Sequence, residues 1–193
     1  MTVTAAEARA ALAARLGAGA YAHSVAVAET ASRLADVYGI DPAEGYLGGL
    51  LHDWARELGS DRLLAQAEAL GVDITDVDRA VPYLLHARVG ALTVRDTLPG
   101  LSERITTAIE RHTTGAPGMG DLDMVVYLAD MLEPGRDFDG VEELRGAIGR
   151  FGLEELYAQA YTASLLHLLK RRKHLHPQTL AAWNAVVESR EHR

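Results

Sequence analysis

The chain has 193 residues, of which 48% are hydrophobic and 24% charged, and it carries a formal net charge of -8. This length and composition predict one ordinary globular domain, and the negative charge argues against binding of nucleic acid through a basic surface. The absence of cysteine excludes disulfides, zinc–thiolate sites, iron–sulfur clusters and thiol nucleophiles, so histidine and carboxylate side chains must hold any transition metal.

Apolar residues recur with helical spacing along most of the chain, and no segment alternates with period two for long enough to predict a strand. We therefore expect an all-α fold of about ten helices, in one domain over residues 1–193. Its core should cover about residues 20–170, with the N-terminal and C-terminal helices packed on it. The predicted helices span residues 4–16, 19–38, 42–57, 61–70, 76–80, 83–97, 102–112, 121–132, 140–149, 153–173 and 177–190.

The Ala-rich N-terminal segment contains Glu7, Arg9 and Arg15 and lacks the uninterrupted apolar stretch of a signal peptide. No segment approaches the run of about 18 apolar residues that a membrane-spanning helix needs. We therefore expect no membrane association and a cytoplasmic location.

The sequence Leu50-Leu51-His52-Asp53-Trp54 places a histidine beside an aspartate inside a predicted apolar helix. Neighbouring residues on a helix point about 100° apart, so His52 and Asp53 cannot both pack into the same buried face. The pair either flanks a site for one ion or consists of a buried histidine beside an exposed aspartate. For an isolated pair, the second interpretation is preferred.

Other polar residues in apolar surroundings change this interpretation. His23, His86 and His112 each lie in an apolar helical context, and Asp130 ends the apolar run 125–129. Unpaired imidazoles and an unpaired carboxylate are costly in a protein core. Convergence of these side chains and the His52-Asp53 pair on a divalent metal removes both costs.

The order H…HD…H…H…D resembles the HD-domain superfamily of metal-dependent phosphohydrolases, and within it the symmetrical bis(5'-nucleosyl)-tetraphosphatase branch, the YqeK family. The resemblance spans about residues 20–170, and it is carried by the segments 50–56, 85–91, 112–115, 127–138 and 140–145. The HTTG and ADMLEPGR sequences are more discriminating than the His-Asp pair. The resemblance implies an all-helical fold around a central metal site, one bound iron or similar divalent ion, or two, and cleavage of diadenosine tetraphosphate into two ADP.

Carried over position by position, the resemblance implies four metal ligands: His23, His52, Asp53 and Asp130. It places His86 and His112 on the phosphate-binding side, where they either serve catalysis together with Asp53 or hold a second ion. It also implies substrate contacts at Thr113 and Arg136. Arg56 is a further cation available for the phosphate chain.

Ala20 departs from the family pattern, which usually has a basic residue three positions before the first histidine. This departure leaves open another nucleotide substrate, namely a nucleoside mono-, di- or triphosphate. A metal-stabilised nucleotide-binding module without activity also stays open. The expected partner is a dinucleoside polyphosphate or other nucleotide, and a homodimer is a further possibility.

Ordinary structural roles compete with several of these assignments. Arg136 either contacts phosphate or forms a salt bridge to Glu133 or Asp137 across a turn, and Thr113 without the family match is a helix-terminal hydroxyl.

Three further features have similar alternatives. Tyr83 either packs between helices or stacks on an adenine. His167 is expected to be a surface or packing residue, and the acids and the arginine of 142–145 a solvated helix pair.

Overall fold

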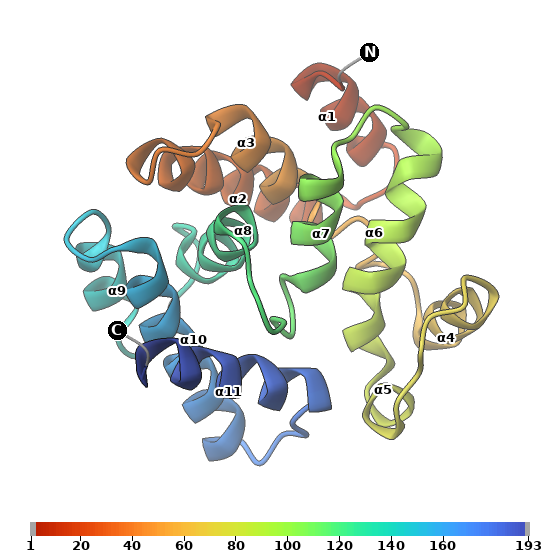
Figure 1. Ribbon diagram of the computed structural model, residues 1–193. Coiled ribbons are helices and arrows are strands. Elements are labelled where there is room, and N and C mark those ends of the chain that lie inside the picture. Colours follow the sequence, from red (N-terminus) through yellow and green to blue (C-terminus); the bar gives the residue numbers. More distant parts are fainter. Residues whose placement is uncertain (1–2, 192–193) are drawn as a thin grey trace.

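The computed structural model describes residues 3–191, in which eleven α-helices and one 3-10 helix occur without any strand (Figure 1). This confirms the expected all-α fold. The helices are α1 (Ala5–Ala13), α2 (Ala18–Val37), α3 (Pro42–Leu51), α4 (Ser60–Ala69), α5 (Asp76–Ala80), η1 (Pro82–Leu85), α6 (His86–Thr97), α7 (Glu103–Arg111), α8 (Asp121–Leu132), α9 (Val141–Ala147), α10 (Leu153–Lys170) and α11 (Pro177–Glu191).

The centre of the fold is formed by α2, α3, α7 and α8, which pack against one another (Figure 1). Helix α8 is buried on nearly all sides, as expected for a helix whose apolar residues surround its axis. Two glycines let α3 approach α2 closely, because a Cβ atom at Gly45 or Gly49 would lie within 3 Å of the α2 backbone. This close packing brings the end of α3 beside the middle of α2.

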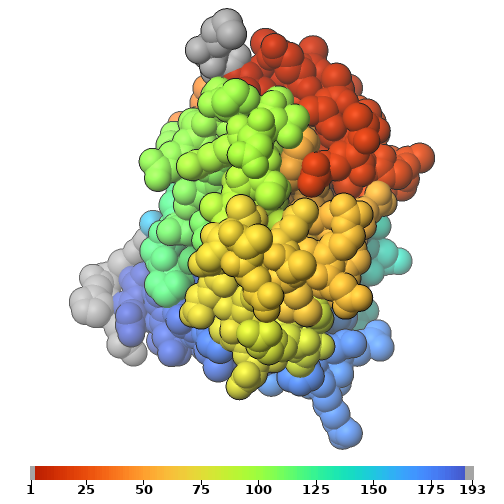
Figure 2. All heavy atoms as spheres, turned by 90° about the vertical axis from the view of Figure 1, so that its right-hand side faces the viewer, coloured from red at the N-terminus to blue at the C-terminus, as the bar shows by residue number. Residues whose placement is uncertain are grey.

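The remaining helices surround this centre. Helix α1 packs on α3, and α4 packs on α6 and η1 through a second, smaller apolar cluster. Figure 2 shows residues of α4 and α5 on one face, between the N-terminal helix and the C-terminal region. Within residues 3–191, no helix has the length and apolar character required to cross a membrane. The expectation of a single domain stays a prediction.

The largest differences from the predicted helices occur at α3 and at the predicted helix 83–97. Helix α3 ends at Leu51 instead of residue 57, and successive turns follow. The His52 ring lies 2.7 Å from the Gly49 carbonyl oxygen, which would otherwise accept the helical hydrogen bond from the Asp53 amide.

The predicted helix 83–97 is divided into η1 and α6 at His86. Nδ1 of His86 likewise donates a hydrogen bond to the carbonyl oxygen of Tyr83. Side-chain hydrogen bonds to the backbone therefore set both boundaries.

Candidate metal centre

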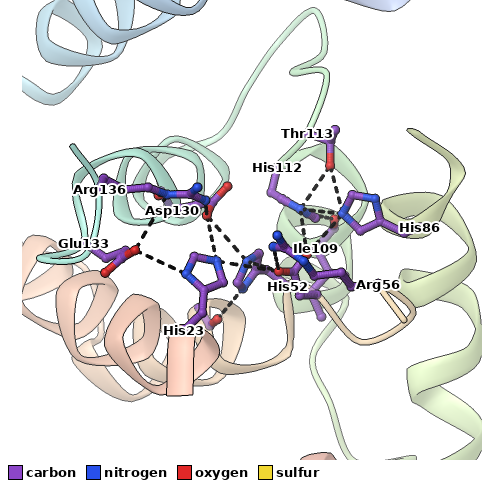
Figure 3. A network of polar contacts seen from close by, with 12 residues as sticks. His23, His52, Arg56, His86, Ile109, His112, Thr113, Asp130, Glu133 and Arg136 are labelled. Atoms are coloured by element: carbon purple, nitrogen blue, oxygen red, sulfur yellow. Dashed lines mark hydrogen bonds and ion pairs between the residues drawn. The ribbon is translucent and has the colours of Figure 1, made fainter. Parts of the chain in front are cut away.

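Four imidazoles and two carboxylates meet where α2, α3, α6, α7 and α8 converge (Figure 3). These are the six residues that the sequence singles out: His23, His52, Asp53, His86, His112 and Asp130. Three of the four histidines lie at helix ends rather than within helices. His52 and His112 are the C-caps of α3 and α7, and His86 is the first residue of α6.

These helix ends fix the protonation of the rings. The Nδ1 atoms of His52, His86 and His112 lie 2.7, 2.6 and 2.8 Å from the carbonyl oxygen three residues earlier. A carbonyl oxygen can only accept a hydrogen bond, so each Nδ1 carries the proton and each neutral ring presents the Nε2 lone pair to the centre. In His23, Nδ1 faces Glu133 Oε1 at 3.3 Å, which favours the same tautomer.

The two oxygens of Asp53 face different halves of the cluster. Oδ2 lies 3.1 Å from Nε2 of His52 and 3.6 Å from Nε2 of His23. Oδ1 lies 3.2 Å from Nε2 of His86 and 3.9 Å from Nε2 of His112. The Asp53 carboxylate, which is buried, therefore lies between the His23–His52 pair and the His86–His112 pair.

The donor set fits a metal ion. Oδ1 of Asp130 lies 3.1 Å from Nε2 of His23 and 3.7 Å from Nε2 of His52. Within the described residues, the buried Nε2 atoms of His23 and His52 have no hydrogen-bond partner. Imidazole lone pairs that face carboxylate oxygens repel them unless a cation lies between, and nitrogen and carboxylate oxygen are the donors that divalent transition metals accept. Among residues 3–191, two groups have ligand atoms within 4.8 Å of one another: His23, His52 and Asp130, and His52, Asp53 and His112.

The charges of the cluster are strongly coupled. Burial alone would raise the pKa of Asp53, but His52 and the other imidazoles hold it well below its ordinary value. Burial likewise opposes ionisation of Asp130, and His23, His52 and Arg136 outweigh it, so the pKa of Asp130 is also lowered. Both carboxylates are therefore charged at neutral pH.

The pKa values of the two buried C-cap histidines, His52 and His112, shift in opposite directions. Burial opposes the charged form of His52, but the neighbouring Asp53 carboxylate outweighs burial and raises the pKa of His52. Burial and the cationic forms of His52 and His86 lower the pKa of His112 to about 3. His112 is therefore a neutral imidazole near pH 7, and its Nε2 lone pair faces Nε2 of His86 at 3.1 Å and the Thr113 hydroxyl.

A cavity of about 200 Å³ opens over the carboxylates and the second pair of histidines. Its lining includes all five residues predicted to contact substrate: Arg56, His86, His112, Thr113 and Arg136. It also includes Tyr127 and Ser164, which sequence reasoning missed as site residues. Tyr127 is one turn before Asp130 on α8, and Ser164 is a polar residue within the apolar segment 163–166 of α10. Both patterns are signals that the sequence contained.

The two arginines that line the cavity each hold one of the carboxylates. Arg56 donates to Oδ2 of Asp53, and Arg136 donates to Oδ1 of Asp130 and, from Nε, to the Asp130 carbonyl at 2.7 Å. The expected Arg136–Glu133 contact is present at 3.7 Å but is the weaker one. In Figure 3 the two arginines lie on opposite sides of His52.

The loop after α7 places Thr113 beside the second pair of histidines. The Thr113 Oγ1 atom lies 3.0 Å from Nε2 of His112 and 3.3 Å from Nε2 of His86. Gly115 in this loop has a φ of +67°, and a Cβ atom there would lie 2.8 Å from a ring carbon of Tyr161. The Tyr161 hydroxyl donates to the carbonyl of Thr114 at 2.7 Å. The glycine of the HTTG sequence is thus required by the backbone and by the packed tyrosine.

The predicted helix pair of Arg145 with Glu142 is present but accounts for only part of the role of Arg145. Arg145 binds Glu142, but it also donates to three backbone carbonyls, at 3.0 Å to Leu132, 2.6 Å to Glu133 and 2.9 Å to Arg136. Arg145 therefore fixes the turn that follows α8 and carries Arg136.

Comparison with known proteins agrees with this geometry. A model of the HD domain matches residues 20–135, which include all the histidines and carboxylates of the cluster. The chain belongs to the HD domain family.

Three curated relatives carry the name "Bis(5'-nucleosyl)-tetraphosphatase, symmetrical". The protein of Halalkalibacterium halodurans is 34% identical over 169 residues, which cover 86% of this chain and 88% of the relative. The protein of Bacillus subtilis is 32% identical and covers 86% and 89%. The resemblance to this branch is thereby confirmed.

A solved structure shares the fold. The crystal structure of a predicted HD superfamily hydrolase involved in NAD metabolism, from Clostridium acetobutylicum, matches with a TM-score of 0.89 at 32% identity. The match covers 98% of this chain and 100% of that one.

Proposed function

We propose that the protein is a metal-dependent hydrolase that cleaves diadenosine tetraphosphate symmetrically into two ADP. The observation that carries this proposal is the largely buried cluster of imidazoles and carboxylates below a cavity lined by Arg56 and Arg136. The names of the three curated relatives support the same activity.

We assign four ligands to the principal ion: His23, His52, Asp53 and Asp130. Iron fits a donor set of imidazole and carboxylate without thiolate, and it is the ion that we propose. The same geometry allows a second ion held by His86 and His112, whose Nε2 atoms lie 3.1 Å apart. A bound divalent ion neutralises charge on the phosphate chain and lowers the pKa of water at the site.

The protein side chains account for the binding and orientation of the phosphates. Arg56 and Arg136 direct guanidinium groups into the cavity, where they stabilise charge on the phosphate oxygens during cleavage. The hydroxyl of Thr113 supplies a further donor, and the neutral rings of His86 and His112 present Nε2 acceptors toward the cavity. Asp53 orients the water that attacks a phosphorus atom of the central anhydride, so that addition of one water breaks one P–O bond and yields two ADP.

Product analysis tests the proposal directly. ADP as the sole nucleotide product from diadenosine tetraphosphate supports symmetrical cleavage, whereas ATP plus AMP would contradict it.

The metal assignment is tested by elemental analysis of Asp53→Ala and Asp130→Ala. Each variant should retain well under half of the metal of the wild type, because each loses a charged ligand. Wild-type metal content in both variants would refute the ligand assignment.

Ala20 motivates a second candidate, a phosphohydrolase that acts on a nucleoside mono-, di- or triphosphate. Ala20 is partly buried and packs against the core, so it brings no positive charge to the site. Comparison of kcat/KM among these nucleotides separates the candidates. A preference for diadenosine tetraphosphate of less than about tenfold, or about 1.4 kcal/mol, would favour the second one.

A further inference from the structure

A second hollow adjoins the cavity over the candidate metal centre. It has a volume of about 260 Å³. The residues that line only this hollow are Phe138, Ala163 and His167, and four others line both spaces: Asp130, Met131, Arg136 and Ser164. The hollow therefore continues directly from the cavity past Arg136. Nothing in the proposed reaction has so far used Phe138 or His167.

An arginine and an aromatic ring occur on each side of the carboxylates. On one side, the guanidinium carbon of Arg56 lies 6.0 Å from the ring centre of Tyr83, which is 42% exposed. On the other side, Arg136 borders the hollow that contains Phe138. In Figure 3, Arg136 lies to the left of His52 and Arg56 to its right.

A substrate that is cleaved at its centre requires two similar binding regions, one for each half. Symmetrical cleavage of a dinucleoside tetraphosphate leaves two phosphates on each nucleoside. Both nucleosides must therefore bind at a similar reach from the point of cleavage, one on each side. Each side needs a cation for the phosphates and an apolar surface for the base.

We infer that the hollow lined by Phe138 and His167 is the subsite for one of the two nucleosides, an inference that rests on the proposed function. Its base stacks on the ring of Phe138, against the apolar wall formed by Met131 and Ala163. Arg136 at the inner edge meets the phosphate next to that nucleoside. His167, which is exposed near the end of α10, offers a ring nitrogen to the polar edge of the nucleoside.

Kinetics of two variants test the subsite. Phe138→Leu keeps an apolar side chain against the core but removes the ring, and His167→Ala changes an exposed residue. We expect kcat/KM for diadenosine tetraphosphate to fall about tenfold in Phe138→Leu and about threefold in His167→Ala. Phe138→Tyr should retain wild-type activity because it restores the ring. The matched control is Leu169→Ala, an exposed residue of α10 outside the hollow, which should stay within twofold of the wild type.

Binding of ADP to the metal-loaded protein separates the subsite from the activity. Calorimetry should find two ADP per wild-type chain, and Phe138→Leu should weaken one of them at least tenfold. If the wild type binds two ADP in this way but does not cleave diadenosine tetraphosphate, the proposed function fails and the subsite stands. If the wild type cleaves it and Phe138→Leu matches the wild type in both assays, the subsite is refuted and the function stands.

Discussion

Each oxygen of the Asp53 carboxylate faces a different pair of histidines. The residue types of this cluster could be predicted from the sequence, since a histidine or aspartate within an apolar run requires a partner. Their geometry could not. The end of α3 at Leu51 depends on a side-chain hydrogen bond from His52 that competes with the helical one, and periodicity carries no information about it.

The main ion-pair partner of Arg136 also could not be predicted from the sequence. Glu133 and Asp137 are its close neighbours in sequence, but Arg136 pairs mainly with Asp130, six residues earlier. The turn through Pro134 and Gly135 folds Arg136 back on α8, and the torsion angles of such a turn are not encoded in residue spacing.

Asp78 provides a pH-dependent test at the scale of one residue. It is fully buried and accepts hydrogen bonds from Arg88 and Thr75, and His176 lies 3.2 Å away. Burial alone would raise the pKa of Asp78, but these contacts lower it to about 2. A lowered pKa adds stability above the pKa of about 4 in the unfolded chain, and that stability is lost as the pH falls toward 2.

Asp78→Asn should therefore lower the free energy of unfolding by about 2 kcal/mol at pH 7. The difference from the wild type should shrink between about pH 4 and pH 2, because the wild-type carboxylate becomes protonated there. Urea denaturation at several pH values measures both quantities. A difference that does not vary with pH would show that the charge of Asp78 is not what stabilises the fold.

The loop 113–118 contains two glycines with the same backbone conformation but different surroundings. Gly115 and Gly118 both have a φ of +67°, but a Cβ atom at Gly118 meets no other atom within 4 Å. Gly118→Ala should cost about 1 kcal/mol of stability from backbone strain alone. Gly115→Ala adds the clash with Tyr161 and should cost about 2–4 kcal/mol.

Gly115→Ala should also lower kcat/KM, because the loop positions Thr113 beside His86 and His112. Urea denaturation and steady-state assays of both variants test this prediction. Equal losses in the two variants would mean that the packing of Gly115 against Tyr161 is unimportant.

Substitution of Arg145 tests whether α9 holds the turn after α8 in position for the site. On α9, its guanidinium group donates to three carbonyls of the turn that carries Arg136. Lysine keeps the charge but lacks the planar fork that reaches all three acceptors. Arg145→Lys should therefore cost about 2 kcal/mol of stability and raise KM through a misplaced Arg136.

Arg150→Lys is the control for this substitution, because Arg150 is exposed just beyond the same helix. It should leave both stability and KM unchanged. The same values in Arg145→Lys and Arg150→Lys would contradict a positioning role of Arg145.

At the scale of the whole molecule, the number of helices and most of their boundaries followed from the sequence, since apolar periodicity and helix caps are local signals. The way in which the helices converge is not local. Gly45 and Gly49 show this, because their lack of a side chain matters only where α3 packs against α2.

Removal of the metal should destabilise the whole fold. An ion that binds only the folded chain, at about 100 times its dissociation constant, adds about 2.7 kcal/mol of stability. Chelation should therefore lower the melting temperature by roughly 5–10 °C. A variant that combines Asp53→Ala with Asp130→Ala should show no such shift. A wild-type melting curve unaffected by chelation would indicate that no metal is bound to the folded protein.

The order of the site residues along the chain has a kinetic consequence. His23 and its partner Glu133 are 110 residues apart, and the other histidines and carboxylates of the cluster lie between them in the sequence. The donors cannot surround an ion until α2 and α8 have docked, and closure of such a long loop is an entropically costly event. The ion should therefore slow unfolding more than it accelerates refolding. In kinetic terms, the metal binds after the transition state for folding and stabilises only the native chain.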